Sequence, residues 1–199
     1  MKIAIIKYNA GNIQSVYFAL QRMGIEPDIT DDPEKIKSAD KVIFPGVGEA
    51  SNTMKYLREH QLDKLIISLK QPVLGICLGL QLMCKHSEEA DTSCLGIFDL
   101  EVKKFTMPDE QVQSFKIPQM GWNTITNIKS GLFDPTLENS YVYFVHSYFA
   151  TTGEHTASVT NYTQTFSSAL HKDNFYATQF HPEKSGNVGV RILNNFLRL

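Results

Sequence analysis

The chain has 199 residues, of which 42% are hydrophobic and 20% are charged, and its formal net charge is −2. This balance excludes disordered, collagen-like and low-complexity proteins, and it gives no electrostatic reason to bind DNA, RNA or an anionic membrane. Three cysteines are too few for a disulfide framework, so we expect a cytoplasmic protein. The apolar run at 72–83 is too short for a membrane helix, and we expect no signal peptide.

In the first half of the chain, short apolar runs that are typical of buried strands alternate with helical patterns. Strands are predicted at 3–8, 27–30, 41–44 and 73–76. Helices are predicted at 12–23, with Asn12 as the N-cap, and at 51–60, 62–69 and 78–86. Apolar strands without polar alternation, each followed by a helix, indicate a parallel sheet with helices on both faces.

In the second half, turn residues separate a series of predicted strands. These strands are 100–105, 141–145, 156–160, 166–171 and 175–180, and a closing helix is predicted at 188–197. We interpret the strands as an antiparallel extension of the sheet. The predicted fold class is therefore α/β, with three α/β/α layers, a mixed and mostly parallel central sheet and an antiparallel extension. No long polar linker interrupts the sequence, so residues 1–199 are expected to form a single domain.

Cys77 lies where a central strand is predicted to turn sharply into a helix, in the segment Gly75-Ile76-Cys77-Leu78-Gly79. A nucleophile elbow requires small residues two positions before and after the nucleophile, because a Cβ atom there clashes with the turn. The N-terminus of the following helix also favours a thiolate. Taken alone, the motif fits equally well a buried structural cysteine between two packing glycines.

His181 and Glu183 lie in the segment Gln179-Phe180-His181-Pro182-Glu183, at the end of another predicted strand. On an extended segment, side chains two positions apart point to the same side, so Glu183 can orient the imidazole of His181. Alone, the segment also fits a surface turn. Together with Cys77 it supplies a nucleophile, a base and an orienting carboxylate, which favours catalysis by a Cys-His-Glu triad.

A third segment, Pro45-Gly46-Val47-Gly48, also follows a predicted strand. Such a loop can direct a backbone N–H at a developing oxyanion, with the Leu78 N–H as a second donor, although it also fits an ordinary tight connection. Cys84 and Cys94 lack the spacing of metal ligands, and the sequence contains no phosphate-binding or dinucleotide-binding glycine loop. We therefore expect neither a metal nor a cofactor.

These motifs resemble those of the class I, or triad, glutamine amidotransferases, and the resemblance covers essentially the whole chain. The family motifs are 75–81 and 180–183. Within the family, the sequence is similar to glutaminase subunits that work with a cyclase in histidine biosynthesis. The segments that carry this closer similarity are 9–12, 45–48, 120–123, 143–148 and 184–185.

The resemblance implies a role for each matching residue. Cys77 attacks the side-chain amide of glutamine, His181 transfers protons, and Glu183 supports His181. The Val47 N–H becomes an oxyanion donor, together with that of Leu78. Glutamine is bound at Gly48, Gln81, Glu89, His146, Ser147 and Tyr148. The partner is a cyclase subunit of the (β/α)8-barrel type, which forms a heterodimer with the glutaminase and receives its ammonia. The partner-facing residues are Asn12, Trp122 and Lys184.

Two positions depart from the pattern of these subunits. Gln119 replaces a histidine, and Ala10 stands where a proline is common; both are expected in interface loops. Three other functions remain open: a paralogous glutaminase that feeds a surface-sugar amidation enzyme, a noncatalytic binding subunit, and a stand-alone thiol hydrolase or peptidase. The intact triad argues against a noncatalytic subunit, and Gln81 with the aromatic segment 143–149 favours glutamine over peptides.

Overall fold

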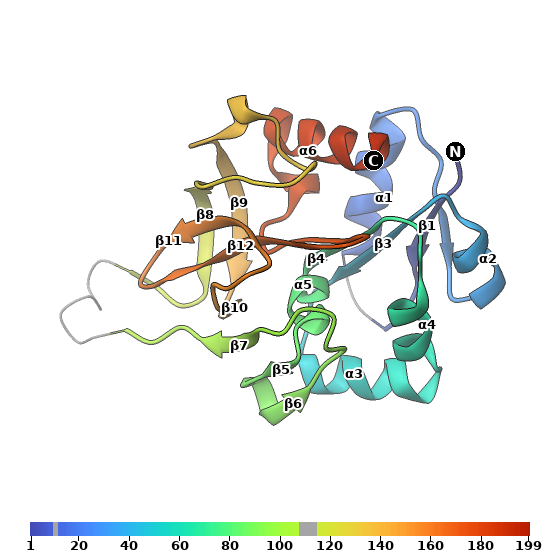
Figure 1. Cartoon of the computed structure of the whole chain (residues 1–199), viewed down its shortest axis with the longest axis horizontal. Coiled ribbons are helices and arrows are strands. Elements are labelled where there is room, and N and C mark those ends of the chain that lie inside the picture. The colour runs from blue at the N-terminus through green and yellow to red at the C-terminus, as the bar shows by residue number, and fades with distance from the viewer. Residues whose placement is uncertain (10–11, 108–114) are drawn as a thin grey trace.

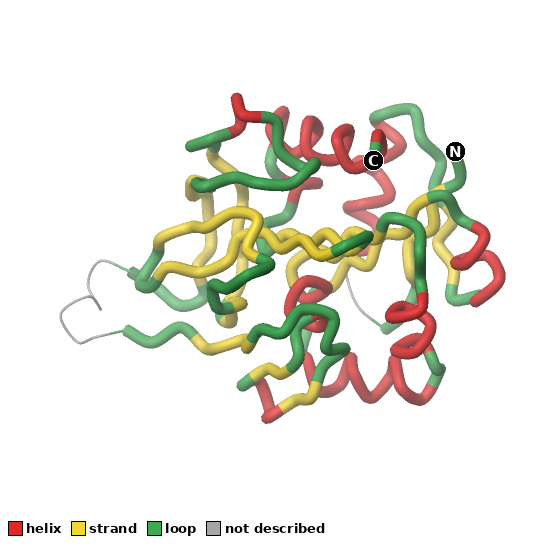
Figure 2. Tube along the Cα trace, in the orientation of Figure 1, coloured by secondary structure: helices red, strands yellow, loops and turns green. Residues whose placement is uncertain are grey.

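A seven-stranded sheet forms the centre of the described structure, a computed structural model that describes residues 1–9, 12–107 and 115–199 (Figures 1 and 2). Ala10 therefore lies outside the described residues. In spatial order the strands are β11 (Thr156–Asn161), β12 (Thr165–Lys172), β13 (Phe175–Thr178), β4 (Val73–Cys77), β3 (Lys41–Gly46), β1 (Ile3–Ile6) and β2 (Asp28–Thr30).

The sheet is mixed, as the sequence predicts. From β13 to β2 neighbouring strands pair in parallel, whereas β11 pairs with β12 and β12 with β13 in antiparallel fashion. Strand β13 was expected in the antiparallel extension, but it runs parallel to β4 and marks the point where the sheet changes direction. A short apolar run carries no information about strand direction, so the hydrophobic pattern alone could not place this boundary.

Helices cover both faces of this sheet (Figure 1). On one face lie α1 (Ile13–Arg22) and α6 (Gly186–Arg198), and on the other lie α3 (Ala50–Glu59), α4 (Leu62–Ser68) and α5 (Leu78–Met83). Alternate strand residues serve the two cores: Ile5 and Ile43 pack with α1 and α6, whereas Ile6 and Phe44 pack with α3 and α4. Every helix in the described ranges is too short or too polar to cross a membrane.

Two smaller sheets lie beside the central one in the described chain. One contains β10 (Tyr148–Ala150), β7 (Glu101–Lys104), β5 (His86–Ser87) and β6 (Thr92–Ser93), and the other pairs β8 (Gln119–Thr124) with β9 (Tyr141–His146). The strands predicted at 100–105 and 141–145 therefore exist, but they do not extend the central sheet. Their placement there was wrong, because partner choice depends on contacts far away in the sequence.

Short helical turns complete the fold. These are α2 (Pro33–Ser38) and the 3₁₀ helices η1 (Glu89–Asp91), η3 (Pro135–Leu137) and η4 (Pro182–Lys184). The helix predicted at 78–86 ends at Met83, because Cys84 is extended and the chain then enters β5, which pairs with β7. Asn12 occupies the predicted N-cap position of α1, but among the described residues its side chain makes no capping hydrogen bond.

Candidate active site

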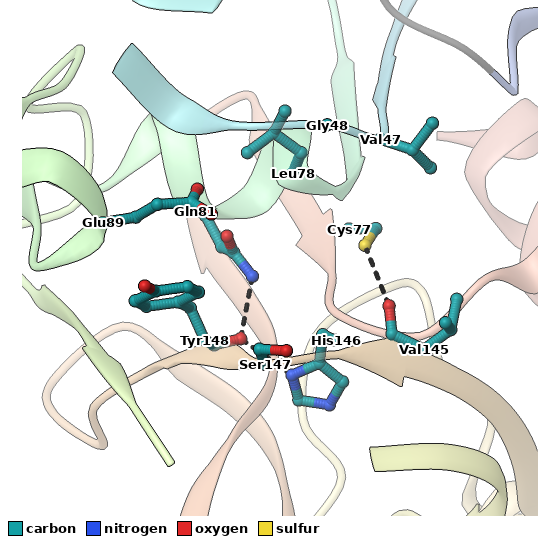
Figure 3. A pocket seen from close by; sticks show the side chains of 10 residues that line it. All are labelled: Val47, Gly48, Cys77, Leu78, Gln81, Glu89, Val145, His146, Ser147 and Tyr148. Carbon is teal, nitrogen blue, oxygen red and sulfur yellow. Dashed lines mark hydrogen bonds between the residues drawn. The ribbon is translucent and has the colours of Figure 1, made fainter. Parts of the chain in front are cut away.

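A cavity of about 250 Å³ opens at the carboxyl end of β4 (Figure 3). It is lined by Val47, Gly48, Cys77, Leu78, Gln81, Glu89, Val145, His146, Ser147 and Tyr148. Open α/β sheets bind ligands at this edge. Each residue expected to bind glutamine or an oxyanion therefore lies on its wall. Within the described ranges, no three His, Cys, Asp or Glu side chains come together as metal ligands.

Cys77 forms the predicted elbow between β4 and α5. Its φ of 55° and ψ of −107° show the sharp turn, which places a non-glycine residue at positive φ. A Cβ atom on Gly79 would overlap the Phe44 carbonyl oxygen, and one on Gly75 would lie 2.9 Å from the Met83 sulfur. The expectation that larger residues would clash on either side of the cysteine is thus confirmed.

His181 and Glu183 form a buried pair with unexposed side chains. The His181 Nδ1 atom lies 2.7 Å from the Glu183 Oε1 atom. Glu183 sits in the single turn of η4 rather than on an extended segment, so the turn at Pro182 brings the carboxylate to the ring. Ser185 secures this turn, since its hydroxyl donates to the His181 carbonyl at 2.7 Å.

The charge state of His181 follows from its neighbours. Burial works against the charged imidazole, but the charges and hydrogen bonds of Cys77 and Glu183 outweigh it and raise the pKa of His181 to about 10. Within the described residues, its Nε2 atom has no other hydrogen-bond partner, so this atom is available to the Cys77 thiol. The arrangement is suited to a thiolate–imidazolium pair.

The side chain of Asn12 turns toward this pair instead of capping α1. Its Nδ2 atom donates to Glu183 Oε1 at 2.6 Å and lies 3.2 Å from His181 Nδ1. Its φ of 72° is in the left-handed region that asparagine tolerates. The amide therefore helps to fix the carboxylate, a contact that the sequence analysis missed.

Comparison with known proteins identifies the family of this chain. The family model described as glutamine amidotransferase class-I matches residues 5–199. The chain belongs to the class-I glutamine amidotransferases. Over all 199 residues it is 60% identical to the imidazole glycerol phosphate synthase subunit HisH of Bacteroides fragilis, with full coverage of both chains. The corresponding subunit of Haemophilus influenzae is 46% identical, over 99% of this chain and 97% of that one.

Solved structures support the fold of this amidotransferase. A putative GMP synthase protein from Thermoplasma acidophilum matches with a TM-score of 0.75 at 20% identity, covering 100% of this chain and 92% of that one. A second structure, titled as a glutamine amidotransferase, matches with a TM-score of 0.73 at 17% identity, covering 98% of this chain and 97% of that one.

His146 lines the amidotransferase cavity, but both of its ring nitrogens already have hydrogen-bond partners. Its ring nitrogens lie 2.7 Å from the Tyr148 carbonyl oxygen and 3.1 Å from the Gln119 amide, and burial lowers the pKa of His146 to about 4. The ring points away from Cys77 in Figure 3. Gln119 was expected in an interface loop, but it is buried in β8 and braces this ring.

The other partner-facing residues expected from the resemblance lie on the surface. Trp122 on β8 is 56% exposed, beside exposed Met120 and Tyr141, and these side chains share one face of the β8–β9 pair. Lys184 in η4 is exposed as well. The outward face of this pair is therefore an apolar surface next to the triad segment.

Two buried residues of the site were missed. The Gln179 amide nitrogen lies 3.7 Å from Cys77 Sγ, and the Tyr8 hydroxyl donates to the Pro45 carbonyl at the start of the glycine loop. Gln179 stands two positions before His181, but both lie beyond the end of β13, so spacing along a strand could not have placed its amide beside Cys77. Tyr8 ends the first predicted strand and carried no such signal.

Proposed function

We propose that this chain is the glutaminase subunit of an imidazole glycerol phosphate synthase. In this proposal it hydrolyses glutamine to glutamate and ammonia, and the ammonia passes to a cyclase subunit. The observation that carries the proposal is the buried Cys77–His181–Glu183 constellation at the cavity, in which the pKa of the imidazole is raised. The full-length likeness to imidazole glycerol phosphate synthase subunits supports the choice of pathway.

Substrate binding uses the cavity wall. Glu89 is half-buried there, and burial raises the pKa of its carboxyl group although its Oε2 atom accepts from the Ala50 N–H at 2.8 Å. We assign its carboxylate to the α-ammonium group of glutamine, an ion pair that offsets the cost of burial. Gly48 and Ser147 offer backbone and hydroxyl groups to the rest of the substrate.

In the first chemical step, the Cys77 thiolate attacks the side-chain carbonyl carbon of glutamine. The oxygen of the tetrahedral intermediate accepts hydrogen bonds from the N–H groups of Leu78 and Val47. His181 then donates its proton to the amide nitrogen, the carbon–nitrogen bond breaks, and ammonia leaves a glutamyl thioester on Cys77.

In the second step, water replaces the thiol. Neutral His181 takes a proton from the water as its oxygen attacks the thioester carbon, and the carbon–sulfur bond then breaks to release glutamate. The thiolate and the imidazolium are restored. The balance is one glutamine and one water consumed, with one glutamate, one ammonia and one proton formed; the proton comes from the new carboxylic acid.

The proposed partner is a cyclase subunit of the (β/α)8-barrel type in a heterodimer. Its proposed contact surface is the exposed face around Trp122, together with Lys184 and Asn12. The cyclase combines ammonia with a nucleotide-derived substrate to form imidazole glycerol phosphate and aminoimidazole carboxamide ribotide. We assign residues 1–199 to one glutaminase domain, since the family model spans 5–199, and place the reaction in the cytoplasm.

The test is to isolate the chain from its native extract and to identify what remains bound. We expect a (β/α)8-barrel cyclase, and we expect the pair to release glutamate from glutamine while it forms imidazole glycerol phosphate. Co-purification with a sugar-amidating enzyme, with no imidazole glycerol phosphate formed, would overturn the proposed pathway. Absence of glutamate release from the assembled pair would overturn the proposed reaction.

A further inference from the structure

Gln179 connects the wall of the cavity to the nucleophile. It is fully buried directly after β13, and its Nε2 atom lies 3.7 Å from Cys77 Sγ. Its Oε1 atom accepts from the Gln81 Nε2 atom at 3.1 Å, and the same nitrogen donates to the Tyr148 carbonyl oxygen at 2.8 Å. A row of hydrogen bonds thus runs from the substrate-binding wall to the sulfur.

The direction of this row is fixed by its outer end. The Tyr148 carbonyl oxygen can only accept, so the nitrogen of the Gln81 amide must face it. That nitrogen also faces Gln179, which therefore turns its oxygen to Gln81 and its NH2 group to Cys77. The NH2 group of Gln179 can therefore donate to the Cys77 sulfur, and the hydrogen bond from Gln81 to the Gln179 oxygen keeps this group oriented.

Besides His181, two groups contact the sulfur, and they favour opposite protonation states. A thiol can donate to the Val145 carbonyl oxygen, 3.9 Å from Sγ, whereas a thiolate can only accept. The Gln179 N–H group therefore stabilises the thiolate, and the Val145 carbonyl stabilises the thiol. Hydrogen bonds to a charged acceptor are stronger than those between neutral groups, so removal of Gln179 shifts this balance toward the thiol.

We propose that Gln179 is a positioning residue for the glutaminase reaction, which holds the Cys77 thiolate through its amide N–H and links it to Gln81. This rests on the proposed glutaminase function, because it assigns Cys77 as the nucleophile. The link also means that a ligand which moves Gln81 alters the reactivity of the sulfur. His181 and Gln179 then share the stabilisation of the thiolate from two sides.

The experiment measures the rate at which iodoacetamide alkylates Cys77 as a function of pH. Alkylation by iodoacetamide does not require the glutamine-binding site. The Cys77→Ser variant gives the background alkylation of the other cysteines, which is subtracted. In Gln179→Met, which keeps the side-chain length, we expect the midpoint of the pH profile to rise by about one unit, a tenfold slower reaction below the midpoint. Gln179→Asn, whose amide is too short to reach the sulfur, is expected to give the same direction.

Two further variants separate positioning from general damage. Ser158→Ala removes a buried hydrogen bond to Ser168 on β11 and β12, away from the cavity, and should leave the midpoint unchanged. Gln81→Met should raise the midpoint less than Gln179→Met does. The double variant should shift it no further than Gln179→Met alone, because Gln81 acts through Gln179.

Two results would overturn the assignment. One is an unchanged midpoint in both Gln179 variants while they unfold cooperatively; the other is an equal shift in Ser158→Ala. The proposed function is judged separately, by glutamate release from the wild-type chain with its cyclase. If the wild-type pair releases no glutamate but the Gln179 variants still shift the midpoint, the proposed reaction is wrong and the role of Gln179 toward Cys77 is still supported.

Discussion

The nucleophile elbow and the glycine loop follow the paired strands β4 and β3 and both line the cavity, but their surroundings differ. At the elbow, a Cβ atom on Gly79 would overlap the Phe44 carbonyl oxygen, and Leu78 is buried. In the loop, Gly48 is exposed at a φ of +127°, and no described atom lies within 4 Å of the position its Cβ would take. The core therefore fixes the position of the sulfur, whereas packing leaves the loop tip unconstrained.

The boundary between these two regions can be located within the loop. The Tyr8 hydroxyl bonds to the Pro45 carbonyl, and a Cβ atom on Gly46 would lie 3.0 Å from the Leu78 Cβ. The first half of the segment is thus tied to the core, and the freedom begins at Val47. His181 and Glu183 are already paired in the isolated chain. The Val47 N–H group, which we assign to the oxyanion, lies at the start of the part that packing leaves unconstrained.

The largest effect on activity is expected at the elbow, from a substitution of Cys77. Cys77→Ser should abolish glutamine-dependent product formation in the assembled enzyme, because the hydroxyl is a far weaker nucleophile than the thiolate. Added ammonium salt should still drive the partner's reaction, since Cys77 makes ammonia but does not use it. Cys94→Ser is the matched control and should keep glutamine-dependent turnover. Retained turnover in Cys77→Ser would place the nucleophile elsewhere.

The base and its carboxylate should differ in the size of their effect. His181→Ala should lower glutaminase activity by on the order of 100-fold or more, because the imidazole moves the protons itself. Glu183→Gln should lower it less, since its amide oxygen can still accept from Asn12 and the Ser185 hydroxyl still holds the segment. The measurement is glutamate release by folded variants with the cyclase present. A larger loss in Glu183→Gln would reverse the assigned roles.

Because of the glycine loop, we expect the isolated chain to hydrolyse glutamine only very slowly. If the Val47 peptide rests with its carbonyl toward the oxyanion position, one donor is missing, and such a loss typically costs roughly 100- to 1000-fold. Binding of the cyclase with its ligand can then shift the peptide population. Glutamate release is measured for the chain alone, with the cyclase, and with the cyclase and its ligand. Equal rates in all three would exclude this gate.

The sequence predicted the layered fold, the elbow at Cys77 and the contact between His181 and Glu183, because all three depend on local patterns. Buried strands such as β4 give continuous apolar runs, and the elbow needs glycines at fixed positions around Cys77. The helix α2 was missed although Asp32 caps it through the Glu34 and Lys35 N–H groups and Pro33 begins it, so the signal was present.

What the sequence could not predict depends on contacts between distant segments. Nothing in the run 100–105 indicates that β7 pairs with β10 instead of joining the central sheet. Asn12 and Gln119 were assigned to surfaces, but one side chain reaches Glu183 and the other braces a buried histidine. Amide side chains adapt to either setting, so their type alone does not decide where they lie.

The smallest expected effects measure the contrast between elbow and loop directly. Gly79→Ala must displace the Phe44 carbonyl or the start of α5, so we expect it to lower the free energy of unfolding by about 3 kcal/mol. Gly48→Ala meets open space and should cost only the strain of positive φ, about 1 kcal/mol. Urea unfolding of both variants gives the two values. Equal losses would show that the loop tip is as tightly constrained as the elbow, and the proposed gate would then lack its mobile element.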